Sequence, residues 1–328
     1  MKAPKFWNKD SSSMLPLLLS PLSAAYALLD KVNRSRTAET TVSVPVICIG
    51  NIVAGGAGKT PVAIAVGQFL LQSGWKVHFL SRGYGGHFTE PTRVVPDVHT
   101  SEQVGDEPLL LAAIAPTWVS KNRVSGANEA IKSGAEIIIM DDGLQNPSLH
   151  KDISLIVIDG DYGIGNGRLM PAGPLRESLE KAMQRSDAAV IIGAANNSLP
   201  KGNFTIPVFG AKIVPHELQA ELVGEKVVAF AGIGRPEKFF KSLRDAGADV
   251  IDVVEFPDHY AYEQDDVMKL VEKAALLGAA LVTTRKDYVR LSPDAKMMTT
   301  VFDIDLVFDK TKGLQKLLID RLGRREHA

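Results

Sequence analysis

The feature that most constrains the fold is a glycine-rich turn between an apolar run and a helical pattern. Residues 44–50, "VPVICIG", have the length of a buried strand, and "VAGGAGKTP" follows at 53–61. A helical pattern over 60–73 begins inside this turn. Glycines let successive backbone N–H groups point at one anion, and a helix start adds free N–H groups and a positive dipole end. This order of strand, turn and helix predicts a phosphate-binding loop.

Each residue of the turn has an expected role. The Lys59 ammonium would reach the β- and γ-phosphates, where it serves catalysis as well as binding, and the Thr60 hydroxyl would bind Mg²⁺. Pro61 suits the first helical turn, where its missing N–H costs nothing. Val53 departs from the usual G-x-x-x-x-G-K-[ST] pattern, because it stands where the first glycine should be. The predicted nucleotide-binding residues are Gly55, Gly56, Ala57, Gly58, Lys59, Thr60 and Pro61.

A pair of aspartates supplies the carboxylate that a phosphate loop needs for its metal. Asp141 and Asp142 directly follow the apolar run "EIIIM". Ligands of open α/β sheets bind at the carboxyl ends of the strands, which is where these aspartates would lie. The sequence therefore predicts a Mg²⁺ site with Thr60 and one or both aspartates. It leaves open which aspartate contacts the metal, and a D-D-G turn without a metal is the alternative.

Apolar runs of strand length alternate with helical patterns along most of the chain, which predicts an α/β fold with a doubly wound, mostly parallel sheet of the P-loop NTPase type. The stretch 194–217 is rich in Asn, Pro and Gly, so we expect a boundary there, with "TIPVFGAKIV" as an extended linker strand. The expected parts are an N-terminal helix over 1–36, a kinase domain over 37–205 and a smaller α/β domain over 206–328.

Composition narrows the class of partner. The 328 residues suggest about two domains, and a net charge of −1 gives no overall field that would recruit nucleic acid. The lone cysteine, Cys48, lies in an apolar run, so we expect a core residue in a reducing compartment.

The first 36 residues combine basic residues with the apolar stretch "MLPLLLSPLSAAYALL" at 14–29. Sixteen residues of helix rise only about 24 Å, short of a bilayer core of about 30 Å, and two prolines interrupt them. The favoured interpretation is an amphipathic helix in the membrane interface. A helix packed on the core, a signal peptide ending near "AYA" and a true membrane span are the alternatives.

Eight short motifs together resemble one family. In order they are "GNIVAGGAGKTP", "SRGYGG", "VGDEP", "DDGLQ", "PAGPLRE", "FAGIGRPEKFF", "FPDHY" and "TTRKD". This series resembles the tetraacyldisaccharide 4'-kinases, the lipid A kinases of Gram-negative bacteria, over about residues 44–290. Ala57 is a small departure, since threonine is common there.

The resemblance implies a reaction and a location. The γ-phosphoryl group of ATP would move, with Mg²⁺, to the 4'-hydroxyl of tetraacyldisaccharide 1-phosphate, giving lipid IVA. The lipid acceptor implies a peripheral enzyme on the cytoplasmic face of the inner membrane, which would give the N-terminal helix a purpose.

The resemblance also implies roles for residues that are unremarkable on their own. Asp106 would take the proton of the sugar hydroxyl, and His259 would pair with Asp106 across the two domains. Arg176 would offer positive charge to phosphate, and Glu177 would join the metal site. Without the resemblance, Asp106 reads as a helix N-cap, His259 as a surface residue, and Arg176 and Glu177 as a helix start. Arg82 in "SRGYGG" is expected to line the same cleft.

Two other classes of protein share some of these features. A regulatory nucleotide switch or partitioning ATPase would also carry a variant glycine-rich loop and a membrane helix, but it would release free phosphate. A nucleotide-dependent export or scaffold protein would need neither Asp106 nor His259. "TTRKD" lacks the Asn-Lys-x-Asp spacing of a guanine reader, so Asp287 is not expected to bind a base.

Overall fold

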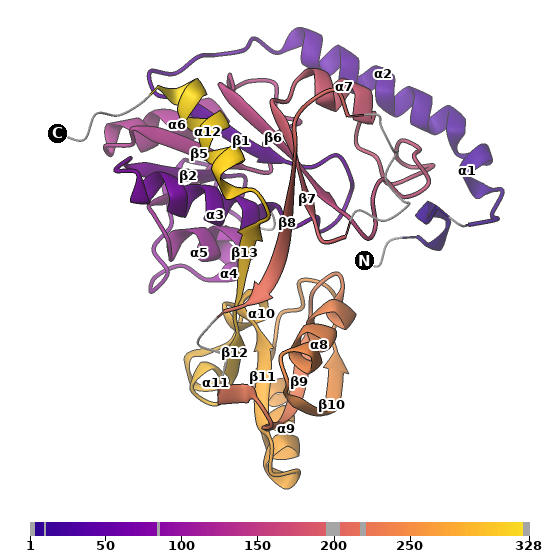
Figure 1. Cartoon of the computed structure of the whole chain (residues 1–328), viewed down its shortest axis with the longest axis vertical. Coiled ribbons are helices and arrows are strands. Elements are labelled where there is room, and N and C mark those ends of the chain that lie inside the picture. Colours follow the sequence, from indigo (N-terminus) through magenta and orange to yellow (C-terminus); the bar gives the residue numbers. More distant parts are fainter. Residues whose placement is uncertain (1–3, 10, 84–85, 195–203, 217–220, 324–328) are drawn as a thin grey trace.

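Two parallel-stranded sheets organise the chain. The computed structural model describes residues 4–9, 11–83, 86–194, 204–216 and 221–323. Figure 1 shows a large domain with the N-terminal helices on its outer side, and a smaller domain joined to it through β8 and β13. This arrangement confirms the predicted doubly wound, mostly parallel α/β fold with a second, smaller α/β domain.

Among the described residues, the large sheet has nine strands in the order β13-β8-β7-β6-β1-β5-β2-β4-β3. The seven strands from β8 to β4 run parallel, and β13 and β3 are antiparallel at the two edges. The chain changes direction across the sheet at β1, where ligands bind in such folds. The strands are β1 (Val46–Gly50), β2 (Val77–Ser81), β3 (Thr92–Arg93), β4 (Thr117–Val119), β5 (Ile137–Asp141), β6 (Ile153–Asp159), β7 (Ala188–Ile192), β8 (Val208–Pro215) and β13 (Ile304–Phe308).

Helices cover both faces of this sheet, so its central strands are apolar on both sides. On one face, α3, α5 and α12 pack on alternate residues such as Ile47 and Ile139. On the other face, α6 and α7 pack on the intervening residues, which include Cys48, the buried thiol predicted from sequence. The helices of this domain are α3 (Lys59–Gln72), α4 (Ser101–Val104), α5 (Asp106–Ala112), α6 (Arg123–Lys132), α7 (Leu179–Gln184) and α12 (Thr311–Leu322).

The small domain is built on a four-stranded parallel sheet in the order β10-β9-β11-β12. The phenylalanines of α8 pack on one face, and α9 packs on the other. Its elements are β9 (Lys226–Ala231), α8 (Pro236–Asp245), β10 (Asp249–Glu255), α9 (Gln264–Leu276), β11 (Ala280–Thr284), α10 (Arg285–Tyr288), α11 (Pro293–Met297) and β12 (Thr300–Phe302).

The sequence predicts a domain boundary in the stretch 194–217, between residues 205 and 206, and residues 195–203 and 217 of that stretch lie outside the described residues. The extended strand expected after the boundary is present as β8, but it pairs with β7 and so belongs to the large sheet. The chain also returns to the large domain at its end, because β13 pairs with β8 and Leu314 and Leu318 of α12 enter the large core. Pairing between such distant segments leaves no local trace in the sequence.

The N-terminal segment forms η1 (Lys5–Trp7), α1 (Leu15–Leu18) and α2 (Ser20–Arg36). Its apolar side chains Met14, Leu15, Leu17, Leu18, Leu22, Leu28 and Leu29 are all exposed. The buried Ser23 faces the protein, where its hydroxyl donates to the Leu169 carbonyl at 2.9 Å and accepts from the Ala172 N–H at 3.1 Å. In the described part of the chain, every helix is too short or too polar to cross a membrane.

Candidate active site

The glycine-rich turn has the backbone that a phosphate loop requires. Gly55 and Gly58 have φ of 115° and 82°, values that favour glycine, and Gly58 is the N-cap of α3. A Cβ at Gly58 would also lie 2.4 Å from the Ile192 side chain. Lys59, Thr60 and Pro61 form the first turn of α3, so free N–H groups of the helix start face the end of β1.

Val53 departs from the consensus because it is tied to another segment. It forms an antiparallel bridge with Leu175, and its side chain enters the core beneath the loop. The neighbouring Ala54 N–H donates to the Pro174 carbonyl at 2.8 Å, and the Arg176 N–H donates to the Ile52 carbonyl at 2.7 Å. The "PAGPLRE" segment therefore supports the phosphate loop from the side.

Asp141 lies directly beside the loop. The Thr60 hydroxyl donates to its Oδ2 at 2.9 Å, and burial raises the pKa of Asp141 to about 7 despite the nearby Lys59 ammonium. Its Oδ1 is buried with no hydrogen-bond partner. A buried carboxylate oxygen without a donor is costly, and a cation would satisfy it.

Asp142 faces the two cations of the site. Its Oδ1 lies 3.5 Å from the Lys59 Nζ and 3.0 Å from the Arg176 Nη1. Although burial opposes ionisation, these charges keep the pKa of Asp142 below its usual value. The residue adopts φ of 55°, a left-handed conformation that aspartate tolerates. Asp142 thus contacts both cations through Oδ1, whereas Asp141 has a buried oxygen, Oδ1, without a donor.

The Glu177 carboxylate is buried among hydrogen-bond donors. Its carboxylate, 5% exposed, accepts from the Gln145 Nε2 at 3.0 Å and from the Arg185 guanidinium. Gln145 also donates to the Asn51 carbonyl and accepts from Arg176, so it links Glu177 to the loop. Arg176 and Glu177 precede α7 (Leu179–Gln184), whose N-cap is Ser178, so the alternative interpretation of these two residues as a helix start is wrong.

The residues around the loop fit a hard divalent cation that retains water and phosphate ligands. No three His, Cys, Asp or Glu side chains among the described residues cluster closely enough to hold a metal without such ligands. Mg²⁺ ordinarily binds one or two carboxylates together with substrate phosphates and water. The Thr60 hydroxyl and the free Oδ1 of Asp141 suit that mode.

Asp106 and His259 meet across the two domains, as the resemblance implied. The His259 Nδ1 lies 2.8 Å from the Asp106 Oδ2, and an ionised carboxylate only accepts, so Nδ1 carries the proton. Asp106 is the first residue of α5 and not its N-cap, which is Gly105. His259 has φ of 58°, and its backbone N–H donates to the Gly232 carbonyl at 3.0 Å.

Two further cations hold this contact. The Arg290 Nη2 donates to the same Asp106 Oδ2 at 2.7 Å, and the Lys286 Nζ lies 2.7 Å from the Glu107 Oε1. Burial opposes ionisation of Asp106, but its bonds to His259 and Arg290 lower its pKa to about 2. Asp106 is therefore a carboxylate at neutral pH.

Sequence reasoning missed Arg290, and only its spacing offers a signal. It follows Asp287 by three residues, which is one helical turn. Asp287 itself is fully buried and accepts hydrogen bonds from Gly232, Tyr262, Thr284 and Arg290. Asp287 is thus unavailable to a purine ring, in agreement with the rejection of a guanine site.

A second set of ion pairs joins the domains. The Arg235 Nη1 lies 2.7 Å from the Asp159 Oδ2 at the end of β6, and its guanidinium stacks over the Tyr162 ring at 4.8 Å. Lys238 also contacts Asp159 and Asp161. The motif "FAGIGRPEKFF" thus contributes to domain docking.

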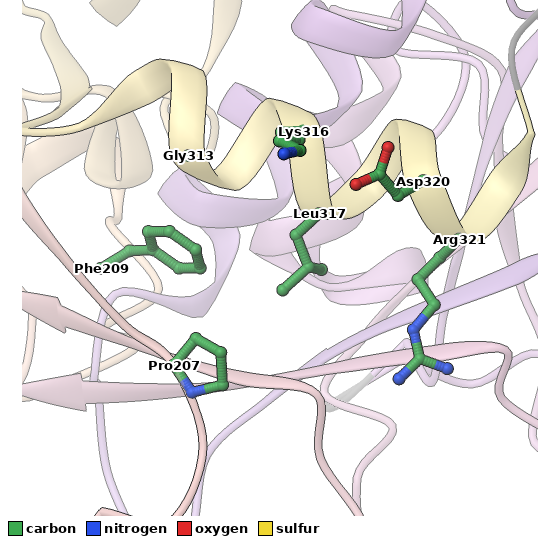
Figure 2. A pocket seen from close by; sticks show the side chains of 7 residues that line it. All are labelled: Pro207, Phe209, Gly313, Lys316, Leu317, Asp320 and Arg321. Carbon is green, nitrogen blue, oxygen red and sulfur yellow. The ribbon is translucent and has the colours of Figure 1, made fainter.

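Other features stand apart from these contacts. Arg82 is exposed just after β2. Burial lowers the pKa of Arg123, and the charge of Arg82 lowers it further. Figure 2 shows a groove between β8 and α12, lined by none of the predicted site residues. The Phe209 and Leu317 side chains face each other in it, and Arg321 pairs with Asp187.

Comparison with known proteins identifies the family. A family model described as tetraacyldisaccharide-1-P 4'-kinase matches residues 15–323. The chain belongs to this family.

Individual tetraacyldisaccharide 4'-kinases align with nearly the whole chain. The relative from Rhodospirillum rubrum is 49% identical over 327 residues, which cover 98% of each chain. The relative from Paramagnetospirillum magneticum is also 49% identical over 327 residues, or 99% of this chain and 100% of its own. A crystal structure described as an "apo" form of LpxK from Aquifex aeolicus in complex with ATP matches with a TM-score of 0.76 at 25% identity, and covers 94% of this chain and 100% of that one.

Membership of the tetraacyldisaccharide 4'-kinase family makes the chain a phosphotransferase of lipid A biosynthesis, as its motifs predicted.

Proposed function

We propose that this chain transfers the γ-phosphoryl group of ATP to the 4'-hydroxyl of tetraacyldisaccharide 1-phosphate, giving lipid IVA. The observation that carries the proposal is the 2.8 Å contact between Asp106 and His259, which places a histidine of one domain on a carboxylate of the other. The site is joined to the phosphate loop through helix packing, because α5, which begins with Asp106, packs on α3, which begins with Lys59.

The glycine-rich turn binds the triphosphate in this proposal. The N–H groups of residues 55–60 would surround the β-phosphate, and Lys59 would reach the γ-phosphate. Mg²⁺ held by Thr60 and Asp141 would neutralise charge on the phosphates, and Asp142 and Glu177 would orient Lys59, Arg176 and Gln145 around them. Arg176, whose side chain is 26% exposed, can also face phosphate.

Asp106 serves as the acceptor of the hydroxyl proton. The 4'-oxygen forms a bond to the γ-phosphorus, the bond to the β,γ-bridging oxygen breaks, and ADP leaves. A carboxylate with a pKa of about 2 is a weak base, so the proton moves late, when the attacking oxygen has become acidic through bonding to phosphorus. His259 holds the carboxylate in place through its Nδ1–H.

The N-terminal helices hold the enzyme at the membrane surface. The seven exposed apolar side chains of residues 14–29 lie on the outside of α1 and α2, while Ser23 faces the protein. Burying one leucine stabilises by about 1.5–3 kcal/mol, so several of them suffice for peripheral binding. We accordingly place the enzyme on the cytoplasmic face of the inner membrane, where its lipid substrate and ATP meet.

A labelling experiment tests the proposed reaction. The full chain is incubated with Mg²⁺, γ-labelled ATP and tetraacyldisaccharide 1-phosphate in detergent or vesicles. We expect the label in the lipid, at the 4'-position. Label found only as free phosphate would instead support the switch or ATPase class, and no consumption of ATP would support the scaffold class.

A further inference from the structure

The Arg290 guanidinium connects the two domains at the position of the proposed base. Its side chain is only 3% exposed. Nη2 donates to the Asp106 Oδ2 at 2.7 Å, and Nη1 donates to the Gly232 carbonyl at 2.8 Å and to the Asp287 Oδ1 at 3.1 Å. One buried cation thus contacts the large domain with one nitrogen and the small domain with the other.

The small domain holds this guanidinium rigidly. Asp287 is itself fixed by the Gly232 N–H at 2.8 Å, the Tyr262 hydroxyl at 2.8 Å and the Thr284 hydroxyl at 2.6 Å. A planar guanidinium with a fixed fork of donors loses little freedom when it is held in this way. The Arg290 Nη2 therefore points at α5 with a set direction.

The same carbonyl positions both donors to Asp106. The Gly232 oxygen accepts from the backbone N–H of His259 and from Arg290. His259 and Arg290 then both donate to the Asp106 Oδ2. Two donors on one oxygen fix the rotation of the carboxylate and leave its other oxygen, Oδ1, for a different contact.

We propose that Arg290 is a positioning residue for phosphoryl transfer. It orients Asp106 toward the sugar hydroxyl only when the small domain is docked on α5. This inference rests on the proposed function. It gives the domain arrangement a direct role in the chemistry, because both groups that orient the base belong to the small domain. The bonds from Arg290 and His259 make Asp106 a weaker base. In return, an undocked enzyme does not present an oriented carboxylate to water or substrate.

The charges that face Asp106 predict a pH signature. The groups around it are His259 and Arg290, together with Lys286 and the neighbouring Glu107. Arg290 favours the ionised carboxylate, so its removal would let burial raise the pKa of Asp106. Activity that needs this carboxylate ionised would then fall at a higher pH than in the unaltered enzyme.

The test compares Arg290→Gln, Arg290→Lys and a control in the full chain, with the labelled lipid as product. Arg290→Gln is expected to lower kcat about 100-fold or more, with KM for ATP within about twofold, and to move the acid limb of the kcat profile up by about one pH unit. Arg290→Lys keeps the charge, so we expect partial recovery of kcat and an acid limb near its original position.

Arg285→Gln is the matched control, because Arg285 begins α10, which ends just before Arg290, but pairs with Asp303 instead of Asp106. Its kcat and pH profile are expected to stay close to those of the unaltered enzyme. If Arg290→Gln does not fold, the pH profile and kcat of Arg290→Lys decide whether Arg290 positions Asp106.

Two results would overturn the role of Arg290. One is Arg290→Gln with normal kcat. The other is a loss of kcat that Arg290→Lys fails to recover, with no movement of the acid limb. Failure of the unaltered enzyme to label lipid would overturn the proposed function instead.

Discussion

Lys59, at the start of α3, pairs with Asp142 and is proposed to bind the triphosphate. Its ammonium lies 3.5 Å from Asp142, and its side chain is 13% exposed at the site where the triphosphate is proposed to bind. Lys59→Ala should abolish transfer of label to the lipid, because the γ-phosphoryl charge loses its main counterion. The melting temperature should change little, since Lys59 makes no packing contact in the core clusters. Normal lipid turnover by this variant would remove the phosphate-loop assignment.

The proposed metal-binding role of Asp141 lowers the stability of the metal-free protein. Its Oδ1 is buried without a partner, and burial raises its pKa. Asp141→Asn should stabilise the metal-free protein by about 1–2 kcal/mol, because a buried carboxylate with no donor at Oδ1 is replaced by a neutral amide while the Thr60 hydroxyl keeps an acceptor. The same variant should lose kinase activity. Chemical denaturation without metal measures the first effect, and an Asn variant less stable than the parent would argue that the carboxylate is structural.

Asp106 and His259 should affect turnover more than nucleotide affinity. Asp106 is the first residue of α5 and pairs at 2.8 Å with His259, which belongs to the small domain. Asp106→Asn and His259→Ala are expected to lower kcat by about 100-fold or more and to leave KM for ATP within a few-fold. A raised KM for ATP at unchanged kcat would show instead that these residues bind nucleotide.

At the scale of elements, α2 presents leucines outward and a serine inward. Changing Leu18, Leu22 and Leu29 together to Gln should weaken binding to anionic lipid vesicles by at least about 100-fold, because these side chains are 57–74% exposed and lose their apolar surface. The control changes Leu276 and Met297, each 87% exposed on the small domain, and should leave vesicle binding unchanged. Equal binding of both variants would contradict a membrane role for the N-terminal helices.

The inward side of α2 supports the loop that braces the active site. The Ser23 hydroxyl bonds to Leu169 and Ala172, and the same segment continues to the Leu175 bridge with Val53. Ser23→Ala should therefore lower the free energy of unfolding by about 1–2 kcal/mol. Ser35→Ala is the control, since that hydroxyl bonds only within its own helix. Equal stability of the two variants would show that the docking contact contributes nothing.

The elements that the sequence predicted well are those with local signals. The order of β1, glycine turn and α3 placed Lys59 and Thr60 correctly, and the apolar run before Asp141 placed it at the neighbouring strand end. The roles of Asp106 and His259 needed the family resemblance, because neither residue has a distinctive local pattern. Arg290 could not be found, since its importance depends on which segments the fold brings against it.

At the scale of the whole molecule, two separate groups of ion pairs dock the small domain. One group joins α5 to Lys286, Arg290 and His259, and the other joins the end of β6 to Arg235 and Lys238. The connecting strands β8 and β13 are paired to each other, so they form the link about which the small domain would turn. The docked arrangement therefore depends on charge as well as on connectivity.

The second group offers a test of docking that does not touch the proposed base. Arg235→Gln combined with Lys238→Gln should enlarge the radius of gyration in solution scattering and lower kcat. Without these ion pairs to Asp159, the small domain would separate from the end of β6. Lys241→Gln is the matched control, since Lys241 pairs with Asp245 on its own helix. An unchanged scattering curve and kcat in the double variant would show that these pairs do not hold the domains together.

The central claim is that the glycine-rich turn presents a triphosphate to a base assembled by both domains. The most direct measurement is a crystal structure of the full chain with Mg²⁺ and a non-hydrolysable ATP analogue. The account predicts the γ-phosphate against Lys59 and the N–H groups of residues 55–60, facing Asp106, with the metal bound to Thr60 and Asp141. A nucleotide bound elsewhere, with the turn empty, would contradict it.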